Sequence, residues 1–370
     1  MNLNTKICTL AIVLFLFLTG CNKTADDNVR IENNHTDTSQ TTSEIQSDTI
    51  TIIGVGDIMM GTTYPFKTLP PDDGKELFSD VKRFLLKADV TFGNLEGPLL
   101  TKGGTPKKCE PESHCVAFRM PEHYASYLKD AGFNIVSIAN NHANDMGPEG
   151  RLSTQETLDK YEIGYAGQTD CPTYIFGKSG ITYGFAAFSS TINTCDINNL
   201  RKAKEIIENL KSKVDIVIVS FHGGAEGTSN QHVTGNSEYF LDEDRGNVYE
   251  FAHTVIEAGA DVVFGHGPHV TRAVEVYNNK FIAYSLGNFC TFGKFGLQGV
   301  LGIAPILKLY VDKQGNFLRG EIIPIRQIKR GIPVYDDSNE VISKIRNLTK
   351  NDFPESNIEI DDDGNIRLSE

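Results

Sequence analysis

From residue 49 onward, the chain alternates short apolar runs with longer stretches whose apolar residues recur at helical spacing. The runs are rich in β-branched side chains and predict strands at residues 51–55, 89–92, 134–138, 215–220 and 261–264. The stretches between them predict helices at 77–86, 122–130, from Pro148, 200–210 and 248–258. This alternation is typical of βαβ units whose strands are buried on both faces. We therefore expect an α/β protein.

The pattern changes after Thr271, where strands follow one another without helices. They are expected at residues 273–277, 281–284, 302–310 and 317–325, joined by turns rich in asparagine and glycine. This order predicts an antiparallel sheet packed on the α/β part. Residues 331–370 are acidic and rich in asparagine, and we expect one helix at 339–346 and loose packing of this tail.

The first twenty residues have the pattern of an export signal. Lys6 precedes an uninterrupted apolar run from residue 7 to 18, which is short for a membrane-spanning helix. Thr19 and Gly20 are small residues directly before Cys21, an arrangement that resembles the bacterial lipobox. The prediction is cleavage before Cys21 and lipidation of its thiol; a plain signal peptide or an uncleaved anchor is the alternative.

A polar segment, residues 22–49, separates Cys21 from the first predicted strand. It is rich in Asn, Asp, Thr and Ser, so it buries too little apolar surface to offset the entropy of ordering. We expect a flexible tether here. The chain then divides into a signal peptide (1–20), a lipidated cysteine with its tether (21–49), one domain (50–330) and the acidic tail (331–370).

The formal net charge of −13 restricts the partners of this chain. Binding to nucleic acid needs clustered Lys and Arg that neutralise phosphates, so we expect no nucleic-acid partner. An acidic polymer would have to be met by a local metal or basic patch, because the overall field repels it.

Five cysteines follow Cys21, and export permits disulfides between them. We expect bonds between Cys109 and Cys115 and between Cys171 and Cys195, which leaves Cys290 unpaired. A zinc site at Cys109 is the other interpretation, but the Cys-x₅-Cys spacing is not a zinc signature.

Residues able to bind metal or transfer protons follow the predicted strands directly. Ligands in open α/β sheets bind beyond the carboxyl ends of the strands, so this placement points to one site. The residues are Asp57; Asn94 and Glu96; Asn140, Asn141, His142 and Asp145; His222 and Glu226; and His266 and His269.

Each of these residues alone has a structural explanation, such as a helix cap or a turn. Five strand ends that all carry such residues are hard to explain that way, so we expect a metal-centred site. Carboxylate, amide and imidazole ligands without thiolate suit Mn, Fe, Zn or Mg, as one or two divalent ions.

The ordered blocks at these strand ends resemble the CapA family of poly-gamma-glutamate capsule biosynthesis proteins. The blocks are Gly56-Asp57-Ile58-Met59, Gly93-Asn94-Leu95-Glu96-Gly97-Pro98, Ile138-Ala139-Asn140-Asn141-His142-Ala143, His222-x₃-Glu226, Gly265-His266-x₂-His269-Val270 and Ile282-Ala283-Tyr284-Ser285-Leu286-Gly287-Asn288-Phe289. CapA proteins look like relatives of calcineurin-type metallophosphoesterases. The resemblance implies a metallophosphoesterase-like two-sheet sandwich flanked by helices over residues 50–330.

The resemblance also implies roles for individual residues. His142 would be the acid for the leaving group, with Asp145 and Glu226 as further catalytic candidates. The implied metal ligands are Asp57, Glu96, Asn141, His222, His266 and His269. The implied pocket residues are Asn94, Asn140, Ser285 and Asn288.

Two other functions compete with a metal-dependent phosphoesterase. Ser285 nearly fits a nucleophile elbow, but no histidine follows His269 in the chain, so the serine would lack its base. The stronger alternative is a non-catalytic, metal-stabilised module that binds or tethers an anionic envelope polymer. In either case we expect an extracytoplasmic protein of the cell envelope, held to the membrane by its lipid, with polyglutamate synthase components as possible partners.

Overall fold

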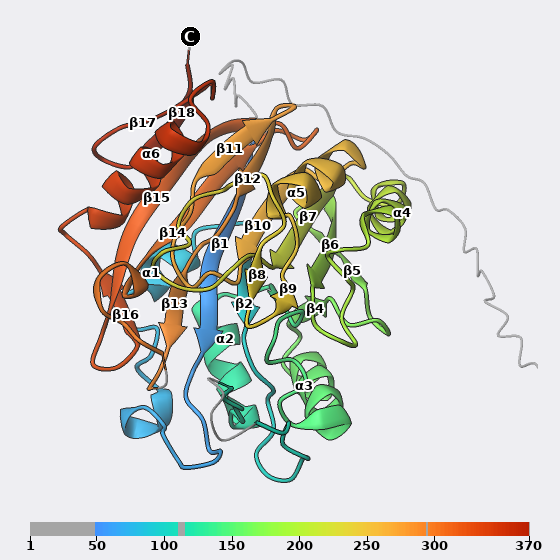
Figure 1. Cartoon of the computed structure of the whole chain (residues 1–370), viewed down its shortest axis with the longest axis vertical. Coiled ribbons are helices and arrows are strands. Elements are labelled where there is room, and N and C mark those ends of the chain that lie inside the picture. The colour runs from blue at the N-terminus through green and yellow to red at the C-terminus, as the bar shows by residue number, and fades with distance from the viewer. Residues whose placement is uncertain (1–48, 110–114, 294, 370) are drawn as a thin grey trace, which may run out of the picture. The chain divides into compact units, whose positions relative to one another are not determined.

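The computed structural model describes residues 49–109, 115–293 and 295–369, and within these ranges two large sheets contain most of the strands (Figure 1). The first sheet comprises β1 (Ile50–Met59), β2 (Val90–Leu95), β3 (Ile135–Ser137), β4 (Gly164–Ala166), β13 (Asn288–Thr291), β14 (Ile303–Val311), β15 (Phe317–Ile328), β16 (Ile332–Tyr335), β17 (Ile358–Ile360) and β18 (Asn365–Leu368). Its order is β17-β18-β15-β14-β1-β2-β3-β4, with β13 paired to β1 and β16 paired to β15.

The second sheet has the order β11-β12-β10-β7-β6-β5. Its strands are β5 (Thr173–Lys178), β6 (Ile181–Ser189), β7 (Ile216–His222), β10 (Val262–His266), β11 (Val274–Tyr277) and β12 (Lys280–Ala283). A separate hairpin joins β8 (Tyr239–Phe240) to β9 (Glu243–Asp244). Strands β6, β7, β10 and β12 run parallel, as do β1 to β4 in the first sheet, so each sheet gathers its carboxyl ends at one edge.

The two sheets pack face to face around an apolar layer. Phe92 of the first sheet stacks on Phe264 of the second, with ring centroids 5.2 Å apart. Side chains alternate along β1, so that Ile52 joins this middle layer and Ile53 joins the layer on the outer face of its sheet. This alternation lets one strand bury apolar side chains on both faces.

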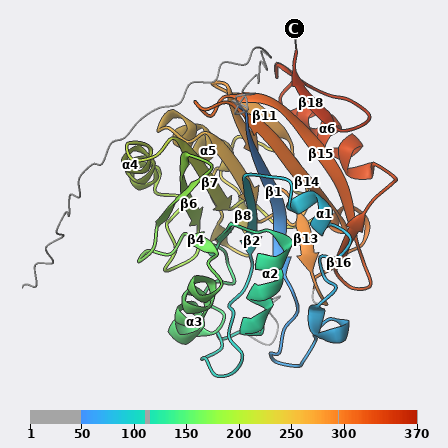
Figure 2. The same cartoon turned by 180° about the vertical axis from the view of Figure 1, so that it is seen from behind.

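Helices flank the sandwich (Figures 1 and 2). They are α1 (Lys82–Leu85), α2 (Ala125–Ala131), α3 (Gly147–Lys160), α4 (Leu200–Lys211), α5 (Val248–Glu257) and α6 (Glu340–Asp352), with short 3₁₀ turns at Pro71–Gly74, Glu122–Tyr124 and Gly299–Leu301. Apolar residues of α4 and α5 pack on the second sheet. Asn199 and Asn247 begin these two helices by accepting hydrogen bonds from Lys202 N and Glu250 N.

The predicted fold class, an α/β two-sheet sandwich flanked by helices, is confirmed. The expected separate antiparallel sheet after Thr271 is wrong, because β11 and β12 extend the second sheet while β14 and β15 extend the first. Strand β14 pairs antiparallel with the first half of β1 from Ile50 to Val55, and so covers an edge that would otherwise be open. The helix expected at 77–86 is shorter, at Lys82–Leu85.

The C-terminal segment packs closely, contrary to the loose packing expected for the tail. Strands β17 and β18 complete the first sheet, and β18 pairs with β15. Helix α6 is longer than predicted, and its Val341, Ile342 and Ile345 are buried in the middle apolar layer. The helix was therefore predicted from the sequence, but the burial of its apolar residues was not.

The cysteine predictions are partly confirmed. Cys109 and Cys115 form a disulfide, whereas Cys171, Cys195 and Cys290 remain thiols within the described ranges. The expected bond between Cys171 and Cys195 is therefore wrong. The Cys171 sulfur lies 3.5 Å from the Gln155 amide nitrogen, and the Cys195 sulfur lies 3.8 Å from the Gln168 carbonyl oxygen, so each thiol has its own polar contact.

The predicted signal peptide, Cys21 and most of the tether fall in residues 1–48, outside the described residues. In the part of the chain that the structure describes, no helix has the length and apolar character needed to cross a membrane.

Candidate metal centre

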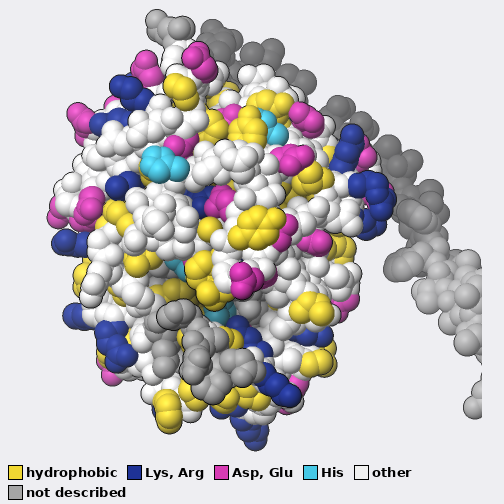
Figure 3. Space-filling model, viewed as in Figure 1, with side chains coloured by type: hydrophobic (Ala, Val, Ile, Leu, Met, Phe, Trp, Pro, Cys, Tyr) yellow, Lys and Arg dark blue, Asp and Glu magenta, His cyan; other side chains and the backbone are white. Residues whose placement is uncertain are grey.

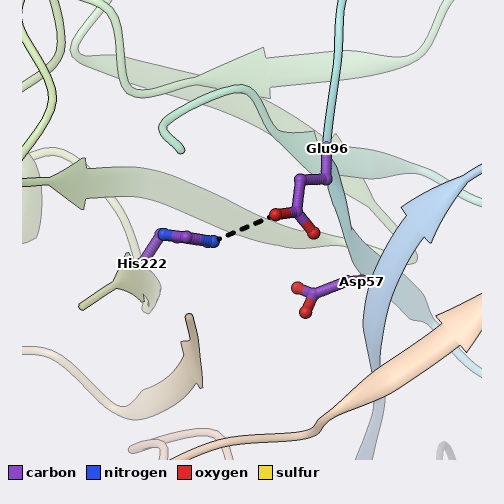
Figure 4. Close-up of side chains that lie close together, drawn as sticks. All are labelled: Asp57, Glu96 and His222. Atoms are coloured by element: carbon purple, nitrogen blue, oxygen red, sulfur yellow. Dashed lines mark ion pairs between the residues drawn. The ribbon is translucent and has the colours of Figure 1, made fainter. Parts of the chain in front are cut away.

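Buried acidic and histidine side chains meet where the carboxyl ends of the two sheets lie opposite each other. Asp57 lies in β1, Glu96 follows β2 directly, and His222 is the last residue of β7. One potential ligand atom from each of these residues lies within 4.8 Å of the other two, and all three side chains are almost fully buried (Figure 4). His266 ends β10 and is paired in register with His222.

Asp57 is the centre of this cluster. Its Oδ1 accepts hydrogen bonds from His266 Nδ1 at 3.0 Å and from Asn94 Nδ2 at 2.9 Å. Its Oδ2 accepts from His269 Nδ1 at 2.9 Å. With Nδ1 of His266 engaged by Asp57, Nε2 is the ring nitrogen left for a ligand. Asp57 therefore fixes the orientation of both histidine rings.

Several buried polar atoms in this cluster have no hydrogen-bond partner among the described residues. They are both carboxylate oxygens of Glu96, Nε2 of His222, Nε2 of His266 and the side-chain oxygen of Asn141. Glu96 Oε1 lies 3.4 Å from His222 Nε2 and 3.6 Å from His269 Nε2. Buried polar atoms are normally paired, because an unpaired one costs free energy. Electron-pair donors that converge in this way fit a divalent cation.

The two buried carboxylates have opposite pKa shifts. Burial alone would raise the pKa of Asp57, but the hydrogen bonds from His266 and His269 outweigh it and hold the pKa well below its usual range. Burial and the neighbouring Asp57 charge raise the pKa of Glu96 well above its usual value. Glu96 is thus the carboxylate whose charge the protein compensates less, since the effect of His269 and Arg245 does not offset burial and the charge of Asp57.

The histidines also differ. Burial and the positive charge of Arg245 lower the pKa of His222, which keeps its ring neutral. For His269, burial lowers the pKa, but Glu96 and Asp57 overcome it and raise the pKa to about 10. The backbone of His269 is left-handed, with φ of 59°, an uncommon conformation for a residue other than glycine.

His142 and Asp145 form a second buried pair beside the cluster. Asp145 accepts hydrogen bonds from His142 Nδ1 at 2.7 Å and from Phe118 N at 2.6 Å, and its other oxygen lies 2.6 Å from Lys107 Nζ. The His142 ring packs on Phe118, with centroids 4.3 Å apart. Burial lowers the pKa of His142 even though Asp145 opposes the shift. Asp145 therefore fixes both the ring and its tautomer.

Glu226 links the cluster to a buried arginine that sequence reasoning missed. Arg245 donates from one guanidinium nitrogen to Glu226 Oε1 at 3.1 Å, and its other terminal nitrogen lies 3.1 Å from Glu243 Oε2. Asn141 Nδ2 also donates to Glu226 Oε1, at 3.3 Å. Arg245 precedes α5 in a charged stretch, and only its tertiary position reveals it as a member of the site.

A cavity of about 420 Å³ opens from this site to the surface. Its lining residues are Lys107, Cys115, Val116, Phe118, Asn141, His142, Glu226, Phe240, Leu241, Glu243, Arg245, His269, Phe295 and Gly296. Figure 3 shows hydrophobic side chains and histidine close together around hollows on this face of the molecule. The cavity brings His142, Asn141 and Glu226 into reach of a molecule that enters it.

The four residues expected in the pocket lie behind the cluster and are not part of that lining. Asn140 Nδ2 donates to Asn94 Oδ1 at 3.0 Å, which fixes the amide that in turn donates to Asp57. Asn288 Nδ2 donates to the His269 carbonyl oxygen at 3.2 Å. Ser285 is buried, and its hydroxyl oxygen accepts from Gly287 N at 3.3 Å. Asn94, Asn140 and Asn288 therefore support residues of the cluster, whereas Ser285 stabilises the turn before β13.

Two facing sheets with carboxylates, amides and histidines at their strand ends define an α/β sandwich with a candidate metal centre. A sequence model of the family described as "Bacterial capsule synthesis protein PGA_cap" matches residues 51–292. The chain belongs to this family of bacterial capsule synthesis proteins, which confirms the resemblance to CapA proteins noted from the motifs.

Individual relatives agree with this assignment. The chain is 31% identical over 323 residues to "PGA biosynthesis protein CapA" of Bacillus subtilis, covering 82% of this chain and 78% of that protein. It is 27% identical over 267 residues to "Capsule biosynthesis protein CapA" of Bacillus anthracis, covering 66% and 60%. The calcineurin-like phosphoesterase YfkN of Bacillus subtilis is similar in structure, with TM-score 0.39, 11% identity and coverage of 83% and 96%. At that TM-score, the likeness says nothing about activity.

Proposed function

We propose that this protein is a metal-dependent hydrolase of the phosphoesterase type that acts in the synthesis or attachment of an anionic capsule polymer such as poly-gamma-glutamate. Its family supports the polymer context, since the relatives are capsule and polyglutamate biosynthesis proteins. The site supports the chemistry. The single observation that carries the proposal is a set of buried electron-pair donor atoms on Glu96, His222 and His266. These atoms have no hydrogen-bond partner among the described residues.

Asp57, Glu96, His222 and His266 would hold the ion, with Asn141 and His269 beside it. Oxygen and imidazole donors without thiolate suit Mn, Fe, Zn or Mg. A divalent ion in such a site polarises a phosphoryl oxygen and lowers the pKa of bound water. Asn94 and Asn140, one hydrogen bond further out, hold Asp57 in place.

His142 is the residue best placed to handle the proton of the leaving group. Its Nδ1 donates to Asp145, so Nε2 is the atom that would exchange a proton with a molecule in the cavity. In the neutral ring Nε2 carries no proton, so it must take one up before it can give one to the leaving group. Arg245 and Asn141 hold Glu226 in the lining of the same cavity, where its carboxylate can orient a substrate.

The proposal includes export and anchoring. The lipobox-like Thr19-Gly20-Cys21 and the polar stretch after it support a lipidated protein that holds its domain outside the cytoplasmic membrane on a flexible tether. The corresponding organisation is a signal peptide (1–20), a lipidated cysteine and tether (21–49), a catalytic domain (50–330) and the C-terminal segment (331–370). An anionic polymer and components of its synthase would then be the neighbours of the site.

The decisive experiment compares His142→Ala with two ligand variants in the purified full-length chain, supplied with Mn or Zn. Metal content and hydrolysis of an aryl and an alkyl phosphate ester are measured in parallel. His142→Ala should keep its metal and lose roughly two to four orders of magnitude in kcat, as expected for a lost general acid. The loss should be smaller on the aryl ester, since an aryl leaving group needs little protonation.

The ligand variants His222→Ala and His266→Ala should instead lose metal and activity together. His123→Ala is the matched control, because His123 is exposed and pairs with Asp73 away from the cavity. If the metal-loaded protein hydrolyses no phosphate ester, while both ligand variants abolish attachment of capsule polymer in cells, the hydrolase proposal is wrong. The polymer-tethering module would then replace it.

A further inference from the structure

The cavity is lined by both polar and hydrophobic side chains. The polar ones are Lys107, Asn141, His142, Glu226, Glu243, Arg245 and His269, and the hydrophobic ones include Val116, Phe118, Phe240, Leu241 and Phe295. Phe240 and Leu241 belong to the β8–β9 hairpin, and Figure 3 shows hydrophobic side chains at this face. A ligand that fills the cavity therefore meets both polar groups and hydrocarbon.

A leucine at position 241 is unfavourable for the stability of the fold, because of its backbone conformation and its exposure. Leu241 and Asp242 form the two-residue turn of the hairpin, and their φ angles are 49° and 62°. Turns of this kind favour Asn-Gly, because a bulky side chain at positive φ is strained. The Leu241 side chain is also 62% exposed, so it gains little from burial. A strained, exposed leucine at the mouth of a site points to a ligand contact.

The hairpin is held at the cavity by ion pairs at its base, which involve the buried arginines Arg245 and Arg272. Arg245, directly after β9, contacts Glu226 and Glu243. Glu238, directly before β8, makes a two-point ion pair with buried Arg272, with both N–O distances 2.7 Å. Ser190 donates a further hydrogen bond to Glu243. These contacts hold the turn in one place, as a preformed binding wall requires.

We propose that the cavity binds an amphiphilic phosphate ester, whose polar head reaches the metal centre while its hydrocarbon group packs against Phe240 and Leu241. The identity of the head rests on the proposed function; the apolar subsite does not depend on turnover. A phosphate ester of a long-chain alcohol has a hydrocarbon group that would cover this wall, and burial of its methylenes would supply affinity.

The test measures binding without hydrolysis. Methylphosphonate and octylphosphonate, which resist cleavage, are titrated into the metal-loaded full-length protein below the concentration at which octylphosphonate self-associates. Octylphosphonate should bind at least about tenfold more tightly, because several methylenes leave water. Leu241→Ser and Phe240→Ser should each reduce this ratio at least threefold, and Leu241→Met should preserve it.

Leu152→Ser is the matched control, since Leu152 is 55% exposed on α3 and does not line the cavity. It should leave the ratio of the two affinities unchanged. Equal binding of the two phosphonates, no binding of either, or an equal effect of Leu152→Ser would each overturn the apolar subsite. Absence of ester hydrolysis in a protein that shows the chain-length preference would instead overturn the hydrolase proposal alone.

Discussion

Asp57 and Glu96 are buried carboxylates whose nearest oxygens lie within 4.8 Å of each other, yet their surroundings treat the charge differently. Asp57 receives three hydrogen bonds, from Asn94, His266 and His269. Glu96 receives none from the described residues, and burial raises its pKa. A charged Glu96 is therefore unfavourable until a cation compensates for it.

Replacement of this carboxylate should separate metal binding from stability. In the presence of a chelator, Glu96→Gln should raise the free energy of unfolding by about 1–3 kcal/mol, because the amide carries no charge to be buried. The difference in the free energy of unfolding between Glu96→Gln and the wild type should grow as the pH rises above the ordinary glutamate pKa. The reason is that a glutamate with a raised pKa in the folded state destabilises that state as the pH increases. With Mn or Zn present, the wild type should be the more stable protein.

Denaturant unfolding with and without metal measures both effects. Glu359→Gln, an exposed change on β17, should alter neither curve. A Glu96→Gln variant that is less stable than the wild type in both conditions would show that Glu96 supports the fold through contacts of its own.

At the scale of the element, β1 connects the fold to the candidate centre. Its first half pairs with β14, and its second half pairs with β13, where Asp57 lies opposite Asn288. Gly56 lies at the change of partner. A Cβ atom there would come within 1.9 Å of the Gly287 carbonyl oxygen, so the two backbones can approach only at a glycine.

A single added methyl group should therefore disrupt both strand and site. Gly56→Ala should lower the free energy of unfolding by about 3 kcal/mol and reduce metal retention, because the backbone that carries Asp57 must move. Gly177→Ala in β5 is the control, since a Cβ atom added there would lie 4.0 Å from its nearest neighbour, the Ile181 carbonyl oxygen. Unfolding curves and metal content report the outcome. Wild-type values of both for Gly56→Ala would contradict the role given to this junction.

Some of these elements and their site residues could be predicted from the sequence, and others could not. His222 and His266 were predictable because each follows an apolar run directly, and parallel strands bring such ends together. The extension of β1 to Met59 was not, because it depends on β13, more than two hundred residues later. The β8–β9 hairpin was also missed, because two-residue strands leave no periodic pattern. Arg245 acquires its role only through contacts with Glu226 and Glu243.

At the scale of the whole molecule, charge limits how a polyanion can approach. The chain carries −13, and among the described residues that line the cavity Lys107 and Arg245 are already paired with carboxylates. An anionic polymer would therefore gain little from the overall field. Tethering close to the membrane would compensate, because it raises the local concentration of the site where the polymer is made.

Loss of the lipid anchor should therefore change the location of the protein and leave the chemistry of its site unchanged. Cys21→Ser should release the mature protein from the membrane fraction or leave it as unprocessed precursor, because the residue that would carry the lipid is gone. Fractionation and the mass of the N-terminal peptide measure this outcome. Cys171→Ser, a change of one thiol in the described domain, should remain membrane-bound. Unchanged processing and fractionation of Cys21→Ser would remove the lipoprotein proposal.

The candidate centre takes Asp57 and Glu96 from one sheet and His222 and His266 from the other. A cation bound by all four residues would link the two sheets. Because the cation would bind only the folded state, it would stabilise that state by mass action. Proteases cut chains mainly when they open. The survival of this protein in the presence of a protease should therefore increase with the supply of metal, so that metal starvation would lower the amount of the protein.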